Sequence, residues 1–297
     1  MAAKTNLITT AQITVEAREQ DFVTRFGDNW DALRAILGIM RPIRKAPGTK
    51  LVSYKAVLDG ELQGGTTVAE GDEIPLTRTK VEPVAYGDIE VAKYAKSVSI
   101  ESVAKYGADV AVEKTDDAFI NALQNKVLGD FYTFLNSGTL TLEETGWQRA
   151  LAMAKAKVLN KFAEMDKDVT EVVGFANILD AYDYLAGKDI TVQTEMGLNY
   201  IENFLGYNTL ILLPEKYVAQ GKVIALPVEN IDLYYIDPSD SDFAKLGLQY
   251  TVQGETNLIG VHVEGDYSRA TGDMFAIMGM KLWAEYLDGI AVATVGG

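Results

Sequence analysis

The chain has 297 residues, of which 48% are hydrophobic and 23% charged, and these proportions are ordinary for a folded protein with a sizeable core. It has no cysteine and one histidine, His262, which excludes disulfides, thiolate metal sites and any metal site that needs two histidines. The formal net charge of −15 argues against a surface that wraps nucleic acid. No apolar run reaches the roughly 18 residues of a membrane span, and the N-terminus lacks a signal-peptide core. We therefore expect a soluble, non-exported protein that makes no membrane contact.

The charge is distributed unevenly along the chain. Residues 1–50 carry eight basic and five acidic side chains, a net charge of +3 in a chain that is otherwise strongly acidic. Between residues 34 and 50 the chain has five basic residues and no acidic one. The basic residues are Arg34, Arg41, Arg44, Lys45 and Lys50. A solvated loop explains this run about as well as a contact with phosphate or with an acidic partner, and both interpretations stay open.

The first 50 residues predict an arm with short helices. Residues 1–27 show no clean periodicity apart from a helical piece near residues 15–26. Asp28 can cap a second helix over residues 29–40, which Pro42 then ends.

Residues 51–100 predict an extended β-hairpin. Residues 51–62 alternate apolar and polar side chains as a half-buried strand does, and the chain returns as strand after a glycine-rich tip. The tip carries Glu70, Asp72 and Glu73, which fit an exposed acidic tip better than a cation site. An isolated two-stranded ribbon is marginally stable in water, so we expect another subunit to cover the hairpin.

Residues 115–136 predict one long helix. Thr115 can cap its N-terminus, and Asp116 and Asp117 place negative charge in the first turn. Apolar residues recur at spacings of three and four: Phe119, Ile120, Leu123, Val127, Leu128, Phe131, Phe134 and Leu135. Because these spacings hold no heptad, we expect a core face rather than a coiled coil.

The rest of the chain predicts a mixed α/β region. A second helix at residues 147–165 has one apolar stripe, formed by Leu151, Ala154, Val158, Leu159 and Phe162. A short helix is predicted at residues 178–187, and strands at 139–142, 169–176, 208–214, 222–227, 231–237 and 290–295. Residues 246–268 predict two long strands around a turn near Gly254.

No catalytic constellation is recognisable. Phosphate-binding, nucleophile-elbow, HExxH and kinase motifs are all missing from the sequence. His262 lies in an alternating run and is better explained as a strand residue than as a catalytic base. The cluster of Asp237, Asp240 and Asp242 lacks the glycine and distal glutamate of a calcium loop, so a turn built on Asx and proline chemistry is favoured.

The order of arm, hairpin, long helix, α/β region and returning C-terminal segment resembles the major capsid proteins of tailed bacteriophages. Their fold is the Hong Kong ninety-seven fold, which encapsulins share. Residues 174–187 (GFANILDAYDYLAG) look like the family's strand, asparagine turn and short helix. Residues 197–237 look like its later strands, and residues 275–295 like the segment that returns to the peripheral domain. The resemblance covers nearly the whole chain.

The resemblance implies an α+β fold with four regions. These are an N-arm (1–50), an extended loop (51–100), a peripheral domain (101–165 and 266–297) with the spine helix at 115–136, and an α/β axial domain (166–265). It further implies a structural protein without enzymatic activity or cofactor. Such a protein assembles through pentamers and hexamers into an icosahedral shell around double-stranded DNA.

The implied partners are other copies of the chain, a separate scaffolding protein, a portal protein, and packaged DNA that is contacted weakly because the bulk of the chain is acidic. The implied location is the virion, with assembly in the host cytoplasm. The basic residues between Arg34 and Lys50 are candidate contacts to acidic surfaces of neighbouring subunits, the hairpin tip among them. Three rival interpretations remain: an encapsulin that encloses a cargo enzyme, an acidic metal-dependent enzyme with a site near Asp237, and a tail tube subunit.

Overall fold

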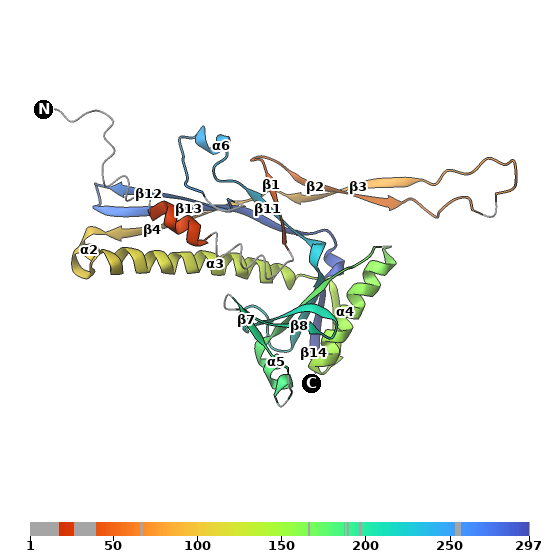
Figure 1. Cartoon of the computed structure of the whole chain (residues 1–297). Coiled ribbons are helices and arrows are strands. Elements are labelled where there is room, and N and C mark those ends of the chain that lie inside the picture. Colours follow the sequence, from red (N-terminus) through yellow and green to blue (C-terminus); the bar gives the residue numbers. More distant parts are fainter. Residues whose placement is uncertain are drawn as a thin grey trace.

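The computed structural model describes residues 18–26, 40–65, 68–165, 167–186, 188, 190–195, 198–252 and 257–296. The chain is an α+β protein with three parts (Figure 1). A long unit comprises residues 18–26, 40–45, 91–135 and 231–284. A compact unit comprises residues 139–230 and 285–296, and a hairpin over residues 51–87 projects away from both. No helix in the described ranges is long and apolar enough to cross a membrane.

The long unit contains a five-stranded sheet. Its strands are β1 (Met40–Lys45), β11 (Ile231–Ile236), β13 (Thr271–Ala284), β12 (Ile259–Asp266) and β4 (Val91–Ser99). Strand β1 runs parallel to β11, whereas β11, β12 and β4 all pair antiparallel with the 14-residue β13. The long strand β13 therefore organises this sheet.

Strand β1 corrects the prediction of a helix that reaches residue 40 and a break at Pro42. Met40 pairs with Ile231 and Lys45 with Ile236, so the basic segment is a strand and not a solvated loop. Pro42, which has no N–H, is tolerated because β1 is the terminal strand of the sheet order. The partner strand lies far along the chain, where no local pattern points to it. The remainder of the predicted helix lies outside the described residues.

The predicted long helix is present as α3 (Lys114–Leu135). It starts differently from the prediction, because α2 (Ile100–Tyr106) and a π-helical turn, η1 (Asp109–Glu113), lead directly into it. Thr115 is consequently no cap: its hydroxyl donates to the carbonyl of Ala111 at 2.8 Å, one turn back. The prediction missed that the helical path begins before Thr115.

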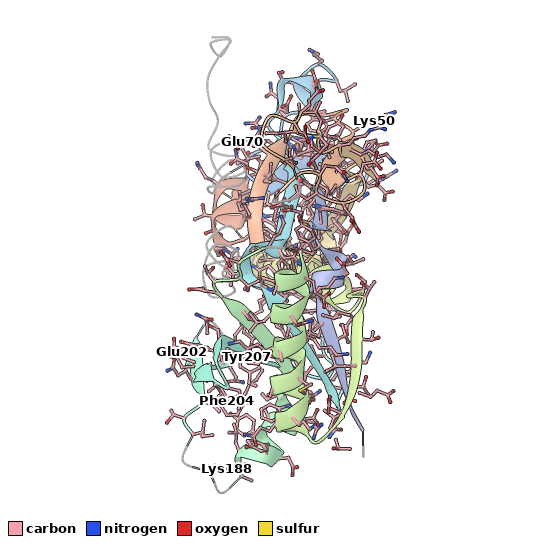
Figure 2. The ribbon with its side chains drawn as sticks, turned by 90° about the vertical axis from the view of Figure 1, so that its right-hand side faces the viewer. Lys50, Glu70, Lys188, Glu202, Phe204 and Tyr207 are labelled. Atoms are coloured by element: carbon pink, nitrogen blue, oxygen red, sulfur yellow. The ribbon has the colours of Figure 1, made fainter. Side chains whose placement is uncertain are left out.

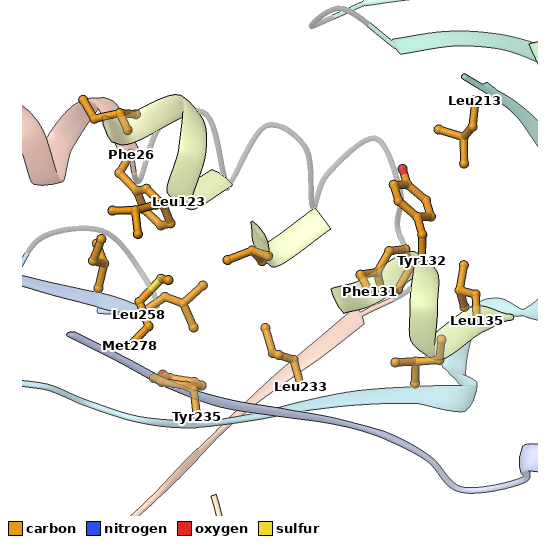
Figure 3. Close-up of a cluster of buried hydrophobic side chains, with 14 of the residues drawn as sticks. Phe26, Leu123, Phe131, Tyr132, Leu135, Leu213, Leu233, Tyr235, Leu258 and Met278 are labelled. Atoms are coloured by element: carbon orange, nitrogen blue, oxygen red, sulfur yellow. The ribbon is translucent and has the colours of Figure 1, made fainter. Parts of the chain in front are cut away.

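The apolar face of α3 packs on the sheet, as the periodicity predicts. Leu123 and Phe131 are 2% and 1% exposed. They face Leu233 of β11 and Met278 of β13 within one continuous core (Figure 3). Residues 18–26 form a short helix, in agreement with the predicted helical piece, and they contribute Phe22, Val23 and Phe26 to the same core.

The compact unit is built on a seven-stranded sheet. The strand order is β5 (Leu140–Thr145), β14 (Ala291–Gly296), β10 (Lys222–Pro227), β6 (Val172–Asn177), β9 (Tyr207–Leu213), β8 (Leu198–Phe204) and β7 (Gln193–Glu195). Helices α4 (Trp147–Glu164) and α5 (Ile178–Leu185) lie beside this sheet and confirm the two predicted helices. Leu159, predicted in the buried stripe of α4, is 40% exposed and does not belong to it.

The two faces of this sheet have different partners. Ala225 packs with the core under α4, whereas Ile224 and Leu226 pack with the core that contains α3. Phe131 and Tyr132 of α3 meet the Phe175 ring edge-on, with centroid distances of 6.3 and 6.0 Å. The C-terminal part of α3 is thus embedded between the two units.

Two further predictions need correction. Residues 246–250 form no strand, and in this region only Thr251 bridges to Val261, while the long antiparallel pair is β12 with β13. Leu246 and Leu248 produce the misleading alternation, yet they are 73% and 47% exposed. The predicted division at residues 165 and 266 also fails, because β5, α4 and β14 belong to the compact unit and β11 and β12 to the long unit.

Candidate functional site

The hairpin is the surface with the clearest need for a partner. Strands β2 (Leu51–Leu58) and β3 (Thr79–Gly87) pair only with each other among the described strands. The return arm predicted as one strand is divided, since β4 joins the five-stranded sheet after β3 ends. Exposed large apolar side chains line the hairpin: Val52, Tyr54, Leu58, Leu62, Ile74, Leu76 and Val81. An array of this kind marks an interaction surface.

The tip of the hairpin is acidic and exposed, as predicted. Glu70, Asp72 and Glu73 are all exposed, and no basic residue occurs between residues 59 and 76. In the view along the hairpin, Glu70 and Lys50 lie in the upper part of the molecule, away from Glu202 and Phe204 of the compact unit in the lower part (Figure 2). The tip therefore presents negative charge together with apolar side chains to whatever lies beyond the subunit.

The basic residues of β1 find acidic partners within their own chain. Arg41 Nε donates to Asp232 Oδ1 at 2.8 Å. Arg44 lies 3.2 Å from the Asp237 carboxylate, which is 3% exposed, and 3.4 Å from that of Asp240. The hydrogen bond and charge of Asp232 raise the pKa of Arg41 above its ordinary value.

The remaining predicted contacts differ in their surroundings. The Lys45 ammonium lies 5.0 Å from the centre of the Tyr234 ring, and Lys50 is exposed next to the base of the hairpin. Arg34 lies outside the described residues. Whether Lys45 and Lys50 contact a neighbouring subunit therefore stays a prediction.

The aspartate cluster after β11 is a turn, in agreement with the prediction. Asp237 Oδ1 accepts from the backbone N–H and hydroxyl of Ser239 at 2.9 and 2.6 Å, and Asp240 Oδ1 accepts from the Asp242 N–H at 3.1 Å. Burial acts to raise the pKa of Asp237, but bonds from Ser239 and Asn257 and the charge of Arg44 outweigh burial and lower this pKa. No group of three potential metal ligands occurs in the part of the chain that the structure describes.

A buried ion cluster, which the sequence analysis missed, anchors the N-terminal helix. Asp116 of α3 is 3% exposed, and its carboxylate accepts from Arg18 Nε and Nη2 at 2.7 and 2.8 Å and from Lys96 of β4. Glu19 accepts from the backbone N–H of Val263 and the hydroxyl of Thr251, each at 2.5 Å. The sequence held one signal for this cluster: Asp116 lies one turn before Ile120, on the apolar face of the helix, where a charged side chain needs a buried partner.

The electrostatics of this cluster are asymmetric. Burial acts to raise the pKa of Asp116, yet the hydrogen bonds and charges of Arg18 and Lys96 together outweigh it and lower that pKa. Burial lowers the pKa of Lys96 despite Asp116, and the nearby charge of Arg18 adds to this effect. Both pKa values fall, which favours the charged form of Asp116 and disfavours that of Lys96, because one carboxylate serves two cations.

Comparisons with known proteins find structural likeness alone. No protein-family model and no curated protein matches the chain. The mature capsid of bacteriophage PhiM1 superposes with a TM-score of 0.58 at 7% identity, over 88% of this chain and 86% of the other. A structure from Gordonia phage Cozz gives 0.58 at 12% identity, over 90% and 87%. The SrpI encapsulin complex from Synechococcus elongatus PCC 7942 gives 0.51 at 12% identity, over 88% and 86%.

These structures share the arrangement of most of this chain, since each match spans most of both proteins. One of them is a mature phage capsid and another is an encapsulin complex. The chain therefore has the Hong Kong ninety-seven fold, an α+β fold.

Proposed function

We propose that this chain is the major capsid protein of a tailed bacteriophage, which assembles through pentamers and hexamers into an icosahedral shell around packaged double-stranded DNA. In this proposal α3 is the spine helix and the hairpin over residues 51–87 is the extended loop. The long unit then takes the peripheral role and the compact unit the axial role.

The observation that carries the proposal is the uncovered hairpin. Its two strands pair only with each other within the described chain, and Tyr54, Leu62 and Leu76 are 69%, 79% and 93% exposed. A two-stranded ribbon with such side chains is only marginally stable in water. A neighbouring copy that covers the ribbon would therefore supply most of the ribbon's stability. Repetition of that contact around a ring would build a capsomer.

The charge of the chain supports a shell that holds DNA loosely. A net charge of −15 repels the phosphate backbone over distances within the Debye length, which is about 8 Å at physiological salt. A DNA-filled shell of this kind lets the genome enter and leave. The proposed further partners are a scaffolding protein during assembly and a portal protein at one vertex.

Expression followed by negative-stain microscopy and analysis of particle contents tests the proposal. We expect the purified protein to form capsomer rings or closed shells. A co-expressed scaffolding protein should make the closed shells more regular. In an infected cell the protein should end in the virion. A persistent monomer with metal-dependent hydrolytic activity would contradict the proposal, and rods or stacked rings would indicate a tail protein.

An encapsulin is the second candidate, because the SrpI encapsulin matches over 88% of this chain. It predicts closed shells that form without a scaffold and contain a protein cargo. Mass spectrometry of nuclease-treated particles separates the two candidates, since a co-purifying enzyme at a fixed ratio to the shell protein is expected only for the encapsulin.

A further inference from the structure

One buried asparagine joins two of the segments that cross the junction between the long and compact units. Asn230 is 4% exposed and lies where the chain passes from β10 to β11. Its Nδ2 donates to the carbonyl of Tyr286 at 2.8 Å, and its Oδ1 accepts from the Tyr286 N–H at 2.9 Å. The backbone N–H of Glu285 donates to the Asn230 carbonyl at 3.1 Å. The side chain thereby continues the ladder of β11 and β13 beyond its last pair, Ile231 with Ala284.

All three segments that carry the described chain between the units meet at residues 285–290. The segment after β10 is held there by Asn230. The segment after α3 is held there too, because the N–H groups of Thr139 and Leu140 donate to the carbonyls of Leu287 and Ile290, each at 3.3 Å. Gly138 fits only as glycine, since a Cβ on it would lie 2.6 Å from the Ile290 carbonyl oxygen. The third segment is residues 285–290 themselves.

Packing does not fill the Asn230 side of this junction. A crevice of about 290 Å³ lies there, and Phe162, Lys167, Pro227 and Tyr286 line it together with Asn230. The ion pair of Lys167 with Glu285 at 3.5 Å is exposed, and that of Lys161 with Asp288 at 3.3 Å is partly exposed. Exposed pairs of this kind constrain a backbone weakly. The two hydrogen bonds of the Asn230 side chain are therefore a buried polar restraint on this side of the junction.

We propose that Asn230 is a positioning residue that sets the angle between the two units and, through that angle, the curvature of the assembled shell. This inference rests on the proposed function. In a closed shell each unit contacts different neighbours, so a change of angle inside the subunit changes the angle between subunits. Loss of the Asn230 hydrogen bonds lets the segment that passes from β10 to β11 move into the crevice.

The test compares Asn230→Ala with a matched control, Asn177→Ala. Asn177 is also a buried asparagine with two side-chain hydrogen bonds to backbone, to the Val218 carbonyl at 2.7 Å and from the Leu179 N–H at 2.8 Å. Its bonds lie within the compact unit, so Asn177→Ala lowers stability without touching the junction. Thermal melting establishes that the two variants are comparably destabilised, and cryo-electron microscopy of assembled particles gives the diameters.

We expect Asn230→Ala to lose the single size class of wild-type particles, while Asn177→Ala keeps it. Asn230→Ala particles of wild-type diameter, or an equal change in Asn177→Ala, would overturn the inference. Should Asn230→Ala not fold, Asn230→Asp decides, because it keeps the Oδ1 acceptor for the Tyr286 N–H and removes only the Nδ2 donor to the Tyr286 carbonyl. Loss of the single size class supports the inference, and an unchanged diameter overturns it. Failure of the proposed function is distinguishable, since wild-type protein would then form no shells.

Discussion

The Asp116 carboxylate of α3 accepts a hydrogen bond from Arg18 Nε at 2.7 Å, across 98 positions of the sequence. Together with Lys96 of β4, this contact joins the N-terminal helix, the five-stranded sheet and the long helix at one point. The Asp116 side chain is 5% exposed, so these ion pairs are buried and hold the three elements together inside the protein.

The first prediction concerns removal of this charge. Asp116→Asn leaves two cations without their counter-ion in a buried site, and breaking a buried pair in this way costs about 3–5 kcal/mol. Asp117→Asn is the matched control, since the Asp117 pair with Arg25 is exposed and worth at most about 1 kcal/mol. Urea denaturation of both variants measures the difference in the free energy of unfolding. An equal loss of stability in the two variants would show that the Asp116 cluster stabilises the fold no more than an exposed ion pair does.

The second prediction is a dependence of stability on pH. Because the pKa of Asp116 is lower in the folded protein than in the unfolded chain, its contribution is complete above the unfolded value, at about pH 4, and is lost as the pH falls through the folded value. The free energy of unfolding should therefore decline below about pH 4. Asp116→Asn should decline less steeply over the same range, and identical slopes would contradict the assignment.

The third prediction tests the core face of α3. Phe131 is 1% exposed and packs against Phe175, so Phe131→Ala should cost about 3–5 kcal/mol, and Phe131→Asp should prevent folding. Leu159→Ala on α4 is the control, and it should cost less than about 1 kcal/mol because that side chain is 40% exposed. Circular dichroism during thermal melting checks both.

The fourth prediction concerns the acidic tip. Replacement of Glu70, Asp72 and Glu73 by their amides should change stability by no more than about 0.5 kcal/mol, because all three side chains are exposed. Assembly, followed by light scattering, should slow and become less sensitive to salt, as charges that steer association are removed. A large loss of stability would mean that the tip belongs to the folded core of the subunit.

The basic partner of the tip is best sought at Lys50. Reversal of Arg41, Arg44 and Lys45 to glutamate should block assembly, but the changes at Arg41 and Arg44 also break ion pairs inside the subunit. Lys50→Glu is the cleaner change, since this residue is exposed beside the hairpin. Normal assembly kinetics in Lys50→Glu would exclude it as a contact.

The fifth prediction concerns the apolar side chains of the hairpin. Leu62→Ser with Leu76→Ser should leave the melting temperature of the isolated subunit nearly unchanged, because both leucines are largely exposed. Assembly should fail, since these side chains are expected to be buried by a neighbour. Leu246→Ser, another exposed leucine outside the hairpin, is the control and should assemble.

Local patterns predicted the elements whose partners lie close in sequence or whose periodicity is strong. The strand predicted at residues 51–62 is present as β2 up to Leu58, and the apolar faces of α3 and α4 are present apart from Leu159. The fold could also be predicted, because the order of the elements resembles a known family.

What could not be predicted depends on distant pairing. Strand β1 exists because β11 offers a parallel edge, and β4 leaves the hairpin because β13 pairs with it over nine residues. The ion cluster around Asp116 and the clamp at Asn230 join segments separated by 98 and 56 positions. Periodicity within one element carries no information about such contacts, so these parts of the candidate sites emerged only from the three-dimensional arrangement.

The central claim is that this chain builds a shell whose subunits cover one another's hairpins. A cryo-electron microscopy reconstruction of the particles formed by the purified protein tests it most directly. We predict closed icosahedral shells in which a neighbouring copy buries Leu62, Ile74 and Leu76. A protein that stays monomeric at every concentration, or a shell in which these side chains remain in solvent, would contradict the account.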